Sequence, residues 1–387
     1  MNSFYAYNPT KILFGPGMIS RIAAELIDVR RLMLVSGQGS AARSGVLDQV
    51  RTALGNIDIV EFAGIEPNPD YTTCMPAVDK ARAAGVDFVL AVGGGSVADA
   101  AKFIAMASGA ASGIDPWQVV AGETPFTGKV LPVGCVQTLP ASGSEMNNAF
   151  VLSHRALRRK VSYSALSLYP RFSVLDPETT RTLSPRQTAL GVVDAFVHVL
   201  EQYATYPHAA PLQDRQAEAI LSTLVEVGAP LLQVPDNIDL RAAVMWCAAQ
   251  AVNGTLSRGV PTDWSVHAIG HELTVLYDLP HAQTLTLVLG NLYRHEIARK
   301  QVKLAQYGAR VWGLSGSPAD VARAAIDKTE QFFESLGVPT RLSALGLDAT
   351  EVADAVVAQL GGRPFHPLGE HKAIDLDAVR AILLADS

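Results

Sequence analysis

Short apolar runs that end in glycine-rich or turn-forming segments recur through the first half of the chain, separated by stretches with helical spacing. The runs at residues 31–36, 57–62 and 88–92 are rich in Val, Leu and Ile, and two further runs lie at residues 130–136 and 172–175. Alternation of strands with helices predicts crossover units in a parallel sheet. Continuous rather than alternating hydrophobicity predicts strands that are covered on both faces.

The second half has a different pattern. From Pro185 onward the long segments are rich in Ala, Leu, Gln and Glu, as helices are. Residues 176–180 are polar and turn-forming, and they lie where the pattern changes. A length of 387 residues fits two or three domains at roughly 150 residues each. We therefore expect a Rossmann-like α/β dinucleotide-binding domain over residues 1–180 and an all-α domain over residues 181–387.

Composition excludes several classes of protein. Hydrophobic residues make up 49% and charged residues 18%, which supports buried cores and excludes disorder. A net charge of −6 argues against a nucleic-acid binder. No apolar run approaches the roughly 20 residues that span a bilayer, and the N-terminus lacks the pattern of a signal peptide. Cys74, Cys135 and Cys247 form no CxxC pair, so we expect a cytoplasmic protein that binds neither nucleic acid nor membrane.

Two turns offer phosphate-binding chemistry. The glycines at residues 93–95 follow an expected strand and open a helix, with Ser96 as a candidate N-cap and Asp99 three residues later. Such a turn lets the backbone approach a pyrophosphate at the helix N-terminus, although a tight turn without a ligand fits equally well. Residues 138–145 bring further hydroxyls to the same end of the sheet, and the two turns together favour a nucleotide site.

Histidines recur at helical spacing with one aspartate. Asp194 and His198 are four residues apart, His267 and His271 repeat that spacing, and His281 follows. Residues at i and i+4 share a helix face, close enough to reach one ion. One carboxylate with several imidazoles suits Zn(II) or Fe(II), and the absence of nearby cysteine argues against a closed structural zinc site. For any single pair, an ordinary ion pair or a hydrogen-bonded core histidine is the simpler interpretation.

The set as a whole favours the metal. Asp194 is embedded among Val, Ala and Phe, where a bare carboxylate would be costly to bury. A bound metal ion offsets that cost, whereas a surface ion pair would not require such surroundings.

At this point the sequence resembles the iron-containing (group III) alcohol dehydrogenase family over essentially its whole length. Within the family it is most similar to the NADPH-dependent broad-specificity aldehyde reductases and butanol dehydrogenases. The motifs that carry the resemblance are Pro9–Gly15, Glu66–Pro69, Gly93–Ser96, Leu139–Glu145, the Asp194/His198 pair and the His267/His271/His281 set.

The resemblance implies a dehydroquinate synthase-like architecture, with the active site between an α/β nucleotide domain and a helical domain. It implies one divalent metal, Zn(II) or Fe(II), held by Asp194, His198, His267 and His281. His271 is similar to the family's non-ligand histidine beside the nicotinamide. A homodimer is implied, with the segment from Tyr5 to Leu13 as its candidate edge strand. The residues that we predict to contact the cofactor are Gly37, Gln38, Gly39, Ser40, Asn68, Gly94, Gly95, Ser96, Asp99, Thr138, Ser142 and Lys160.

The turn after the first expected strand bears on the choice of cofactor. NAD enzymes place a carboxylate after an early strand to bind the ribose 2′-hydroxyl. Here residues 37–40 contain no acid, the next acid is Asp48, and Arg43 is the nearest cation. This pattern predicts NADP(H). Gln38 departs from close relatives, which tend to have Gly in this loop, and the basic segment 153–160 has no assignment.

These features predict hydride transfer between NADP(H) and short- to medium-chain aldehydes or primary alcohols. Phe150, Val151 and Leu256 are apolar candidates for residues near the metal. Alternatives are polyol oxidation of the glycerol dehydrogenase type, a dehydroquinate synthase-like lyase, and a nonenzymatic NADP sensor. The lyase needs a basic pocket, and the segments around Asp194 and His267 supply few cations. A sensor has no need of a Lewis acid.

Overall fold

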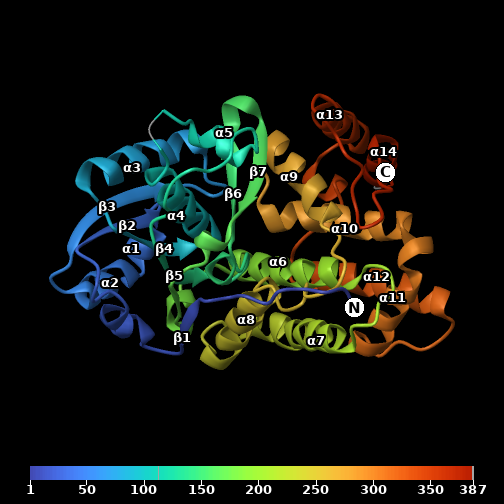
Figure 1. Ribbon diagram of the computed structural model, residues 1–387. Coiled ribbons are helices and arrows are strands. Elements are labelled where there is room, and N and C mark those ends of the chain that lie inside the picture. The colour runs from blue at the N-terminus through green and yellow to red at the C-terminus, as the bar shows by residue number, and fades with distance from the viewer. Residues whose placement is uncertain (112, 386–387) are drawn as a thin grey trace. The chain divides into compact units, whose positions relative to one another are not determined.

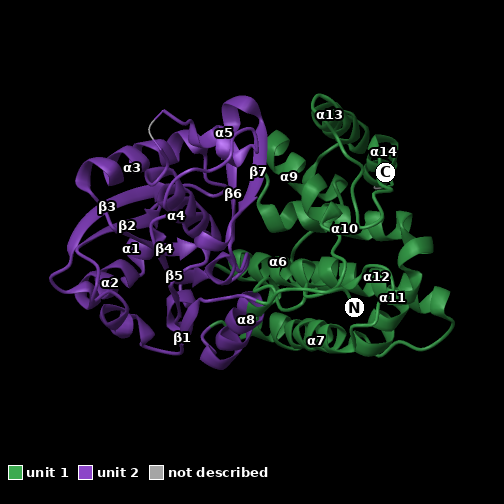
Figure 2. Ribbon diagram, in the orientation of Figure 1, with its two compact units in different colours: residues 1–6, 184–235, 250–387 green, residues 7–183, 236–249 purple. Residues whose placement is uncertain are grey.

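The computed structural model describes residues 1–111 and 113–385 (Figure 1). The chain forms two compact units (Figure 2). Residues 7–183 and 236–249 form one, which we call the sheet unit. The other, which we call the helical unit, holds residues 1–6, 184–235 and 250–387. The domain boundary that we predicted between residues 180 and 181 stays a prediction.

The sheet unit contains six strands in the order β1-β8-β5-β4-β2-β3 (Figure 1). Every neighbouring pair is parallel, which confirms the predicted fold class. The strands are β1 (Lys11–Phe14), β2 (Arg31–Gly37), β3 (Asp58–Ile65), β4 (Phe88–Gly94), β5 (Val133–Leu139) and β8 (Phe172–Leu175). The helices are α1 (Ser40–Arg43), α2 (Val46–Leu54), α3 (Tyr71–Ala84), α4 (Gly95–Ser108), α5 (Pro116–Val120) and most of α8 (Ile238–Ala251).

Alternate residues of the central strand β4 enter two different cores. Phe88, Leu90 and Val92 pack with residues of α2, whereas Val89 and Ala91 pack with residues of α3 and α4. All five side chains are at most 2% exposed. Because successive side chains of a strand point to opposite faces, helices cover both faces of the sheet, and the continuous hydrophobicity of this run has its explanation.

A hairpin contains the basic segment at residues 153–160, which had no assignment from the sequence pattern. Strands β6 (Ala149–His154) and β7 (Arg159–Ser164) pair antiparallel. Their cations have polar partners inside the sheet unit: Arg155 lies 2.9 Å from Glu66, and Lys160 donates to the Asn68 side-chain oxygen at 2.9 Å. These cationic side chains of the hairpin therefore take part in local ion pairs and hydrogen bonds.

A buried lysine holds the turn after β5 from inside. The Nζ atom of Lys102, on α4, lies 2.5–3.0 Å from five oxygens of Ser144, Asn147 and Ala149. Burial lowers the pKa of Lys102 to about 8. Asp99, one helical turn earlier, accepts a hydrogen bond from the Ser144 hydroxyl at 2.6 Å. These contacts give the turn a fixed shape, because buried polar groups without partners are costly.

The helical unit starts with α6, whose N-terminus has a capping box. The Ser184 side chain accepts from the backbone of Gln187, the Gln187 side chain accepts from the backbone of Ser184, and Pro185 opens the first turn. The other helices are α7 (Pro211–Gln233), α9 (Ser265–Tyr277), α10 (His281–His295), α11 (Ile297–Val311), α12 (Pro318–Ser335), α13 (Ala349–Gly361) and α14 (Leu376–Leu384), and α6 spans Pro185–Tyr203. None of the described helices is long and apolar enough to cross a membrane.

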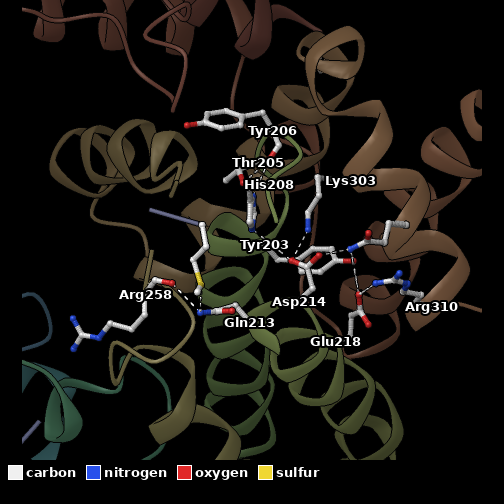
Figure 3. Close-up of polar contacts among 12 residues, drawn as sticks. Tyr203, Thr205, Tyr206, His208, Gln213, Asp214, Glu218, Arg258, Lys303 and Arg310 are labelled. Carbon is white, nitrogen blue, oxygen red and sulfur yellow. Dashed lines mark hydrogen bonds and ion pairs between the residues drawn. The ribbon is translucent and has the colours of Figure 1, made fainter. Parts of the chain in front are cut away.

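A polar network fastens the end of α6 to α7 and α11 (Figure 3). Lys303 contacts Asp214 at 2.6 Å and lies over the ring of Tyr203 at 4.1 Å. The Tyr203 hydroxyl donates to Glu218 at 2.9 Å, which also accepts from Arg310 at 2.8 Å. Because breaking one partner of such a network leaves a buried charge unpaired, the network holds α6 firmly, and α6 carries two of the expected metal ligands.

Candidate metal centre and nucleotide-binding site

Four of the expected ligands come together in the helical unit. Asp194 and His198 lie on α6, His267 lies in the first turn of α9, and His281 opens α10. One ligand atom from each can be chosen so that all four lie within 4.8 Å of one another. Helical spacing explains the Asp194–His198 pair, but the meeting of three helices depends on tertiary packing.

The distances suit one ion. The Asp194 Oδ1 atom lies 3.9 Å from His198 Nδ1 and 3.8 Å from His281 Nε2. Around a tetrahedral ion with bonds of about 2.0–2.2 Å, ligand atoms are about 3.3–3.6 Å apart. Small side-chain rotations bring the present separations into that range.

The chemistry of the donors also fits a cation. Asp194 is 4% exposed and His198 is 7% exposed. Among the described residues, neither Asp194 Oδ1 nor His198 Nδ1 has a hydrogen-bond partner. Burial lowers the pKa of His198 to about 4, so the imidazole is neutral and keeps a lone pair for a ligand bond. A buried carboxylate oxygen without a donor is costly, and a divalent ion satisfies all these atoms at once.

His271 stands beside this group. It lies one turn after His267 on α9, and its ring centroid is 5.4 Å from that of His281 and 6.4 Å from that of His267. It is partly exposed and does not belong to the group of four. His271 thus lies close to the four candidate ligands without being one of them.

Sequence reasoning missed Glu201, which lies behind His267. Its side chain is fully buried and is hydrogen-bonded to Nδ1 of His267. Burial, with a further contribution from Asp263, raises the pKa of Glu201 well above its ordinary value. The available signal was its place on α6, seven residues after Asp194, which puts both on one helix face.

The two predicted phosphate-binding turns meet in the sheet unit. A Cβ atom on Gly95 would come within 2.0 Å of the Ser142 hydroxyl oxygen, and one on Gly94 within 3.1 Å of Leu139. The glycines at the start of α4 are therefore required for the close approach of these turns. Free backbone N–H groups at this helix N-terminus can bind a phosphate.

Three more predicted residues lie at the same place. The Ser96 hydroxyl oxygen is 3.3 Å from the backbone N–H donor of Asn68, and Lys160 donates to the Asn68 side chain. Asn68 adopts a positive φ of 52°. The set offers hydroxyl, amide and ammonium groups, which suit an anionic, hydroxyl-rich ligand such as a dinucleotide.

The turn at residues 37–40 joins β2 to α1. A Cβ atom on Gly37 would lie 3.5 Å from the side chain of Val97, the residue that follows Ser96. Gly39 has a φ of 105°, and a Cβ atom there would lie 3.0 Å from a guanidinium nitrogen of Arg43. Gln38 and Ser40 are exposed. This turn thus lies near the phosphate-binding turns and has a cation beside it.

The remaining predicted residues have mixed positions. Thr138, near the end of β5, is partly exposed. Both carboxylate oxygens of Asp99 accept hydrogen bonds from the protein, from Ser144 and from the backbone of Val151, which makes it a support of the turn. Phe150 is 1% exposed within the core of the sheet unit, and Leu256 is 3% exposed, so neither offers an open apolar surface.

Comparisons with known proteins show the family of the chain. The family model for iron-containing alcohol dehydrogenase matches residues 9–177, and that for the C-terminal part of the Fe-containing alcohol dehydrogenase family matches residues 188–386. The chain is 48% identical over 383 residues to the NADPH-dependent aldehyde reductase YqhD of Escherichia coli, covering 99% of each chain.

Solved structures give the same result. The substrate- and cofactor-free form of the aldehyde reductase YqhD from E. coli superposes with a TM-score of 0.92 at 46% identity, over 100% of each chain. The NADH-dependent butanol dehydrogenase A from Thermotoga maritima superposes with a TM-score of 0.94 at 30% identity, over 100% of this chain and 99% of that one. The chain therefore belongs to the iron-containing alcohol dehydrogenase family.

Proposed function

We propose that this protein is a metal-dependent, NADP(H)-linked alcohol dehydrogenase that reduces short- and medium-chain aldehydes to primary alcohols. The observation that carries the proposal is the convergence of Asp194, His198, His267 and His281 in a chain of this family. The name of the E. coli relative, an NADPH-dependent aldehyde reductase, supports the reaction class. The overall reaction consumes an aldehyde, NADPH and a proton and yields an alcohol and NADP⁺.

The four side chains, three of them buried, would hold one divalent ion, Zn(II) or Fe(II), since three imidazole nitrogens and a carboxylate oxygen suit either. When bound, the ion supplies Lewis acidity toward a carbonyl oxygen. Asp194 provides the negative charge of the ligand set, and the neutral imidazoles provide directed lone pairs. The network around Tyr203 keeps the α6 ligands in place, which supports a preorganised site.

His271 is the proposed proton donor. Reduction of a carbonyl places a proton on its oxygen, and the donor must lie within hydrogen-bond reach of that oxygen, directly or through one water. The partly exposed imidazole of His271 lies beside the ligand His281 but outside the group of four, which supports this role.

The cofactor is proposed to be NADP(H), with the turn at residues 37–40 near the 2′-phosphate. Asp48, the first acid after the turn, is paired with Arg51 at 2.7 Å. A carboxylate about 4 Å from a phosphate with nearly two negative charges would cost roughly 2 kcal/mol in water and more in a partly buried site. The neutral turn avoids that cost, and Arg43 adds a cation beside Gly39.

Electrostatic pairing argues against a phosphorylated substrate. Lys300 contacts Asp263 at 2.8 Å and Glu370 at 2.7 Å, and Arg363 is paired with Glu272, the neighbour of His271. These cations are matched to carboxylates, so they offer no basic pocket of the kind that a dehydroquinate synthase-like lyase needs. This pairing favours uncharged aldehydes.

A homodimer is also proposed. Strand β1 is at one edge of the sheet. Phe14, its last residue, is 38% exposed, and Tyr7, which precedes the strand, is 52% exposed. An exposed edge strand with apolar neighbours is a surface that proteins usually cover. The molecular mass in solution, measured by light scattering, tests this assignment.

The proposed function predicts oxidation of NADPH by purified, metal-loaded protein when butanal is added. We expect kcat/KM for butanal to be at least about tenfold higher than kcat/KM for a phosphorylated aldehyde. It should exceed kcat/KM for glycerol, measured in the reverse direction with NADP⁺, by the same factor. A tenfold difference corresponds to about 1.4 kcal/mol, roughly one good polar or charged contact. A higher kcat/KM for either of the other substrates would contradict the proposal.

Asp194→Ala should remove the metal and leave the fold intact, because the carboxylate is the anionic ligand and its own burial is unfavourable without a cation. The measurements are metal content by elemental analysis and far-UV circular dichroism. Glu226→Ala, at an exposed position of α7, is the matched control and should keep full metal content. Full metal occupancy in Asp194→Ala would show that Asp194 is not a ligand.

His271→Ala should keep its metal and lose turnover by roughly 10²-fold, the usual contribution of a general acid. The pH profile of kcat should also lose one limb. His295→Ala, at the exposed end of α10, serves as the control. Loss of metal would instead make His271 a ligand, and an unchanged kcat would remove it from the mechanism.

The cofactor assignment predicts at least a tenfold preference for NADPH over NADH in kcat/KM. Gln38→Asp should abolish this preference by repulsion of the 2′-phosphate. Arg43→Ala should lower kcat/KM for NADPH alone, by about tenfold, the loss expected for about 1.4 kcal/mol. Arg21→Ala, an exposed arginine of the same unit, should change neither. Equal use of both cofactors by the parent protein would refute the assignment.

A further inference from the structure

Glu201 connects two of the helices that form the metal centre. It lies on α6, three residues after His198, and its side chain has no exposed surface. One carboxylate oxygen accepts the backbone N–H of Val266 at 2.7 Å. The other is hydrogen-bonded to Nδ1 of His267. Both oxygens are therefore directed at the first turn of α9.

We propose that Glu201 is a positioning residue for His267, fixing its tautomer and ring orientation so that Nε2 faces the metal. The proposal rests on the metal centre assigned under the proposed function. A neutral imidazole has one N–H donor and one acceptor nitrogen. Because the Glu201 carboxylate accepts the Nδ1–H, the lone pair remains on Nε2, which makes that atom the ligand.

The carboxylate also strengthens the ligand bond. A negative charge that accepts the second N–H of a metal-bound imidazole makes the ring a better electron donor, and such partners commonly change metal affinity by about 10- to 100-fold. The hydrogen bond to Val266 holds the carboxylate from its other side. His267 can then rotate little about its side-chain bonds, so its orientation is set before an ion arrives.

The other buried charges near Glu201 are paired with one another, so the carboxylate of Glu201 interacts with His267. The nearest buried acid, Asp263, accepts from the backbone N–H and hydroxyl of Ser265 and is paired with Lys300 at 2.8 Å. Lys300 is 1% exposed and has Glu370 as its second anionic partner. The lysine thus compensates Asp263 and Glu370, whereas the carboxylate of Glu201 lies against the imidazole of His267.

Glu201 also has a purely structural role, which the experiment must distinguish from its role in positioning His267. Val266 is in the first turn of α9, where backbone N–H groups lack partners within the helix. A carboxylate there caps the helix and interacts favourably with its dipole. Loss of the cap changes stability, whereas loss of the imidazole contact changes metal affinity and the geometry around the ion.

The experiment uses the full chain in three variants: Glu201→Leu, which removes both contacts, Glu201→Gln, which keeps one neutral acceptor, and Glu330→Gln, a buried control on α12 whose partner is Arg294. Each protein is stripped of metal, and Co²⁺ and Zn²⁺ affinities are measured by competition with a chelator. The visible absorption bands of the Co²⁺ form report the geometry around the ion. Thermal unfolding without metal measures the structural effect separately.

We expect Glu201→Leu to weaken Co²⁺ and Zn²⁺ binding by about 10- to 100-fold and to shift the Co²⁺ bands. Glu201→Gln should weaken binding less, by several-fold, since its amide oxygen still accepts one N–H. Glu330→Gln should lower thermal stability, because it weakens a partly buried ion pair with Arg294, while keeping the affinity and bands of the parent. This ordering supports the positioning role.

Parent-like affinity and bands in Glu201→Leu would overturn the inference. If that variant does not fold, parent-like affinity and bands in Glu201→Gln have the same meaning. Failure of the parent protein itself to bind either ion would instead refute the metal centre, and with it the proposed function. The two failures are therefore distinguishable.

Discussion

A carboxylate buried among apolar side chains sets the main requirement on the helical unit. Asp194 is 4% exposed, and its Oδ1 atom has no hydrogen-bond partner among the described residues. An ionised carboxylate in such surroundings needs a compensating positive charge, or else it becomes protonated. Burial keeps His198 neutral, so that imidazole does not supply the charge. A metal ion bound between the four ligands supplies this positive charge directly.

The same requirement recurs elsewhere in the helical unit. Lys303 on α11 is matched to Asp214 on α7. Lys300 on α11 is matched to Asp263 and Glu370 and donates to the backbone oxygen of Ala204 just after α6. A buried pair is weak evidence for net stability but strongly penalises arrangements that separate its members. These pairs therefore specify how α6, α7 and α11 pack, and the packing of α6 in turn sets the positions of Asp194 and His198.

Much of the sheet unit could be predicted because its signals are local. The run at residues 172–175 forms a strand with those bounds, and the two glycine-rich turns meet as expected of parallel strands. Within the run at residues 130–136, strand β5 begins at Val133. Pro132 accepts a hydrogen bond from Val89 of β4 but has no N–H to donate to a ladder. The hairpin β6–β7 was missed because Arg158 occupies its left-handed position, with a φ of 50°, where Gly or Asn would have signalled a turn.

Less of the candidate site could be predicted from the sequence, because part of it depends on contacts between residues that are far apart in the chain. Spacing alone paired Asp194 with His198, but the resemblance to a family was needed to choose His267 and His281 over His271. The place of Glu201 on the same helix face as Asp194 did not reveal its role, because its partner His267 is 66 residues away and a glutamate in a helix usually faces solvent. The buried contacts of Lys102 were missed for the same reason. Tertiary packing decides such residues, and local pattern does not report it.

The account depends most on one ion occupying the point where Asp194, His198, His267 and His281 meet. The most direct test is anomalous diffraction from crystals of the metal-loaded protein, recorded on both sides of the zinc and iron absorption edges. The account predicts a single strong anomalous peak in the helical unit, about 2.0–2.2 Å from one atom of each of the four side chains. A peak elsewhere, or a peak that lacks Asp194 or His267 among its ligands, would contradict it.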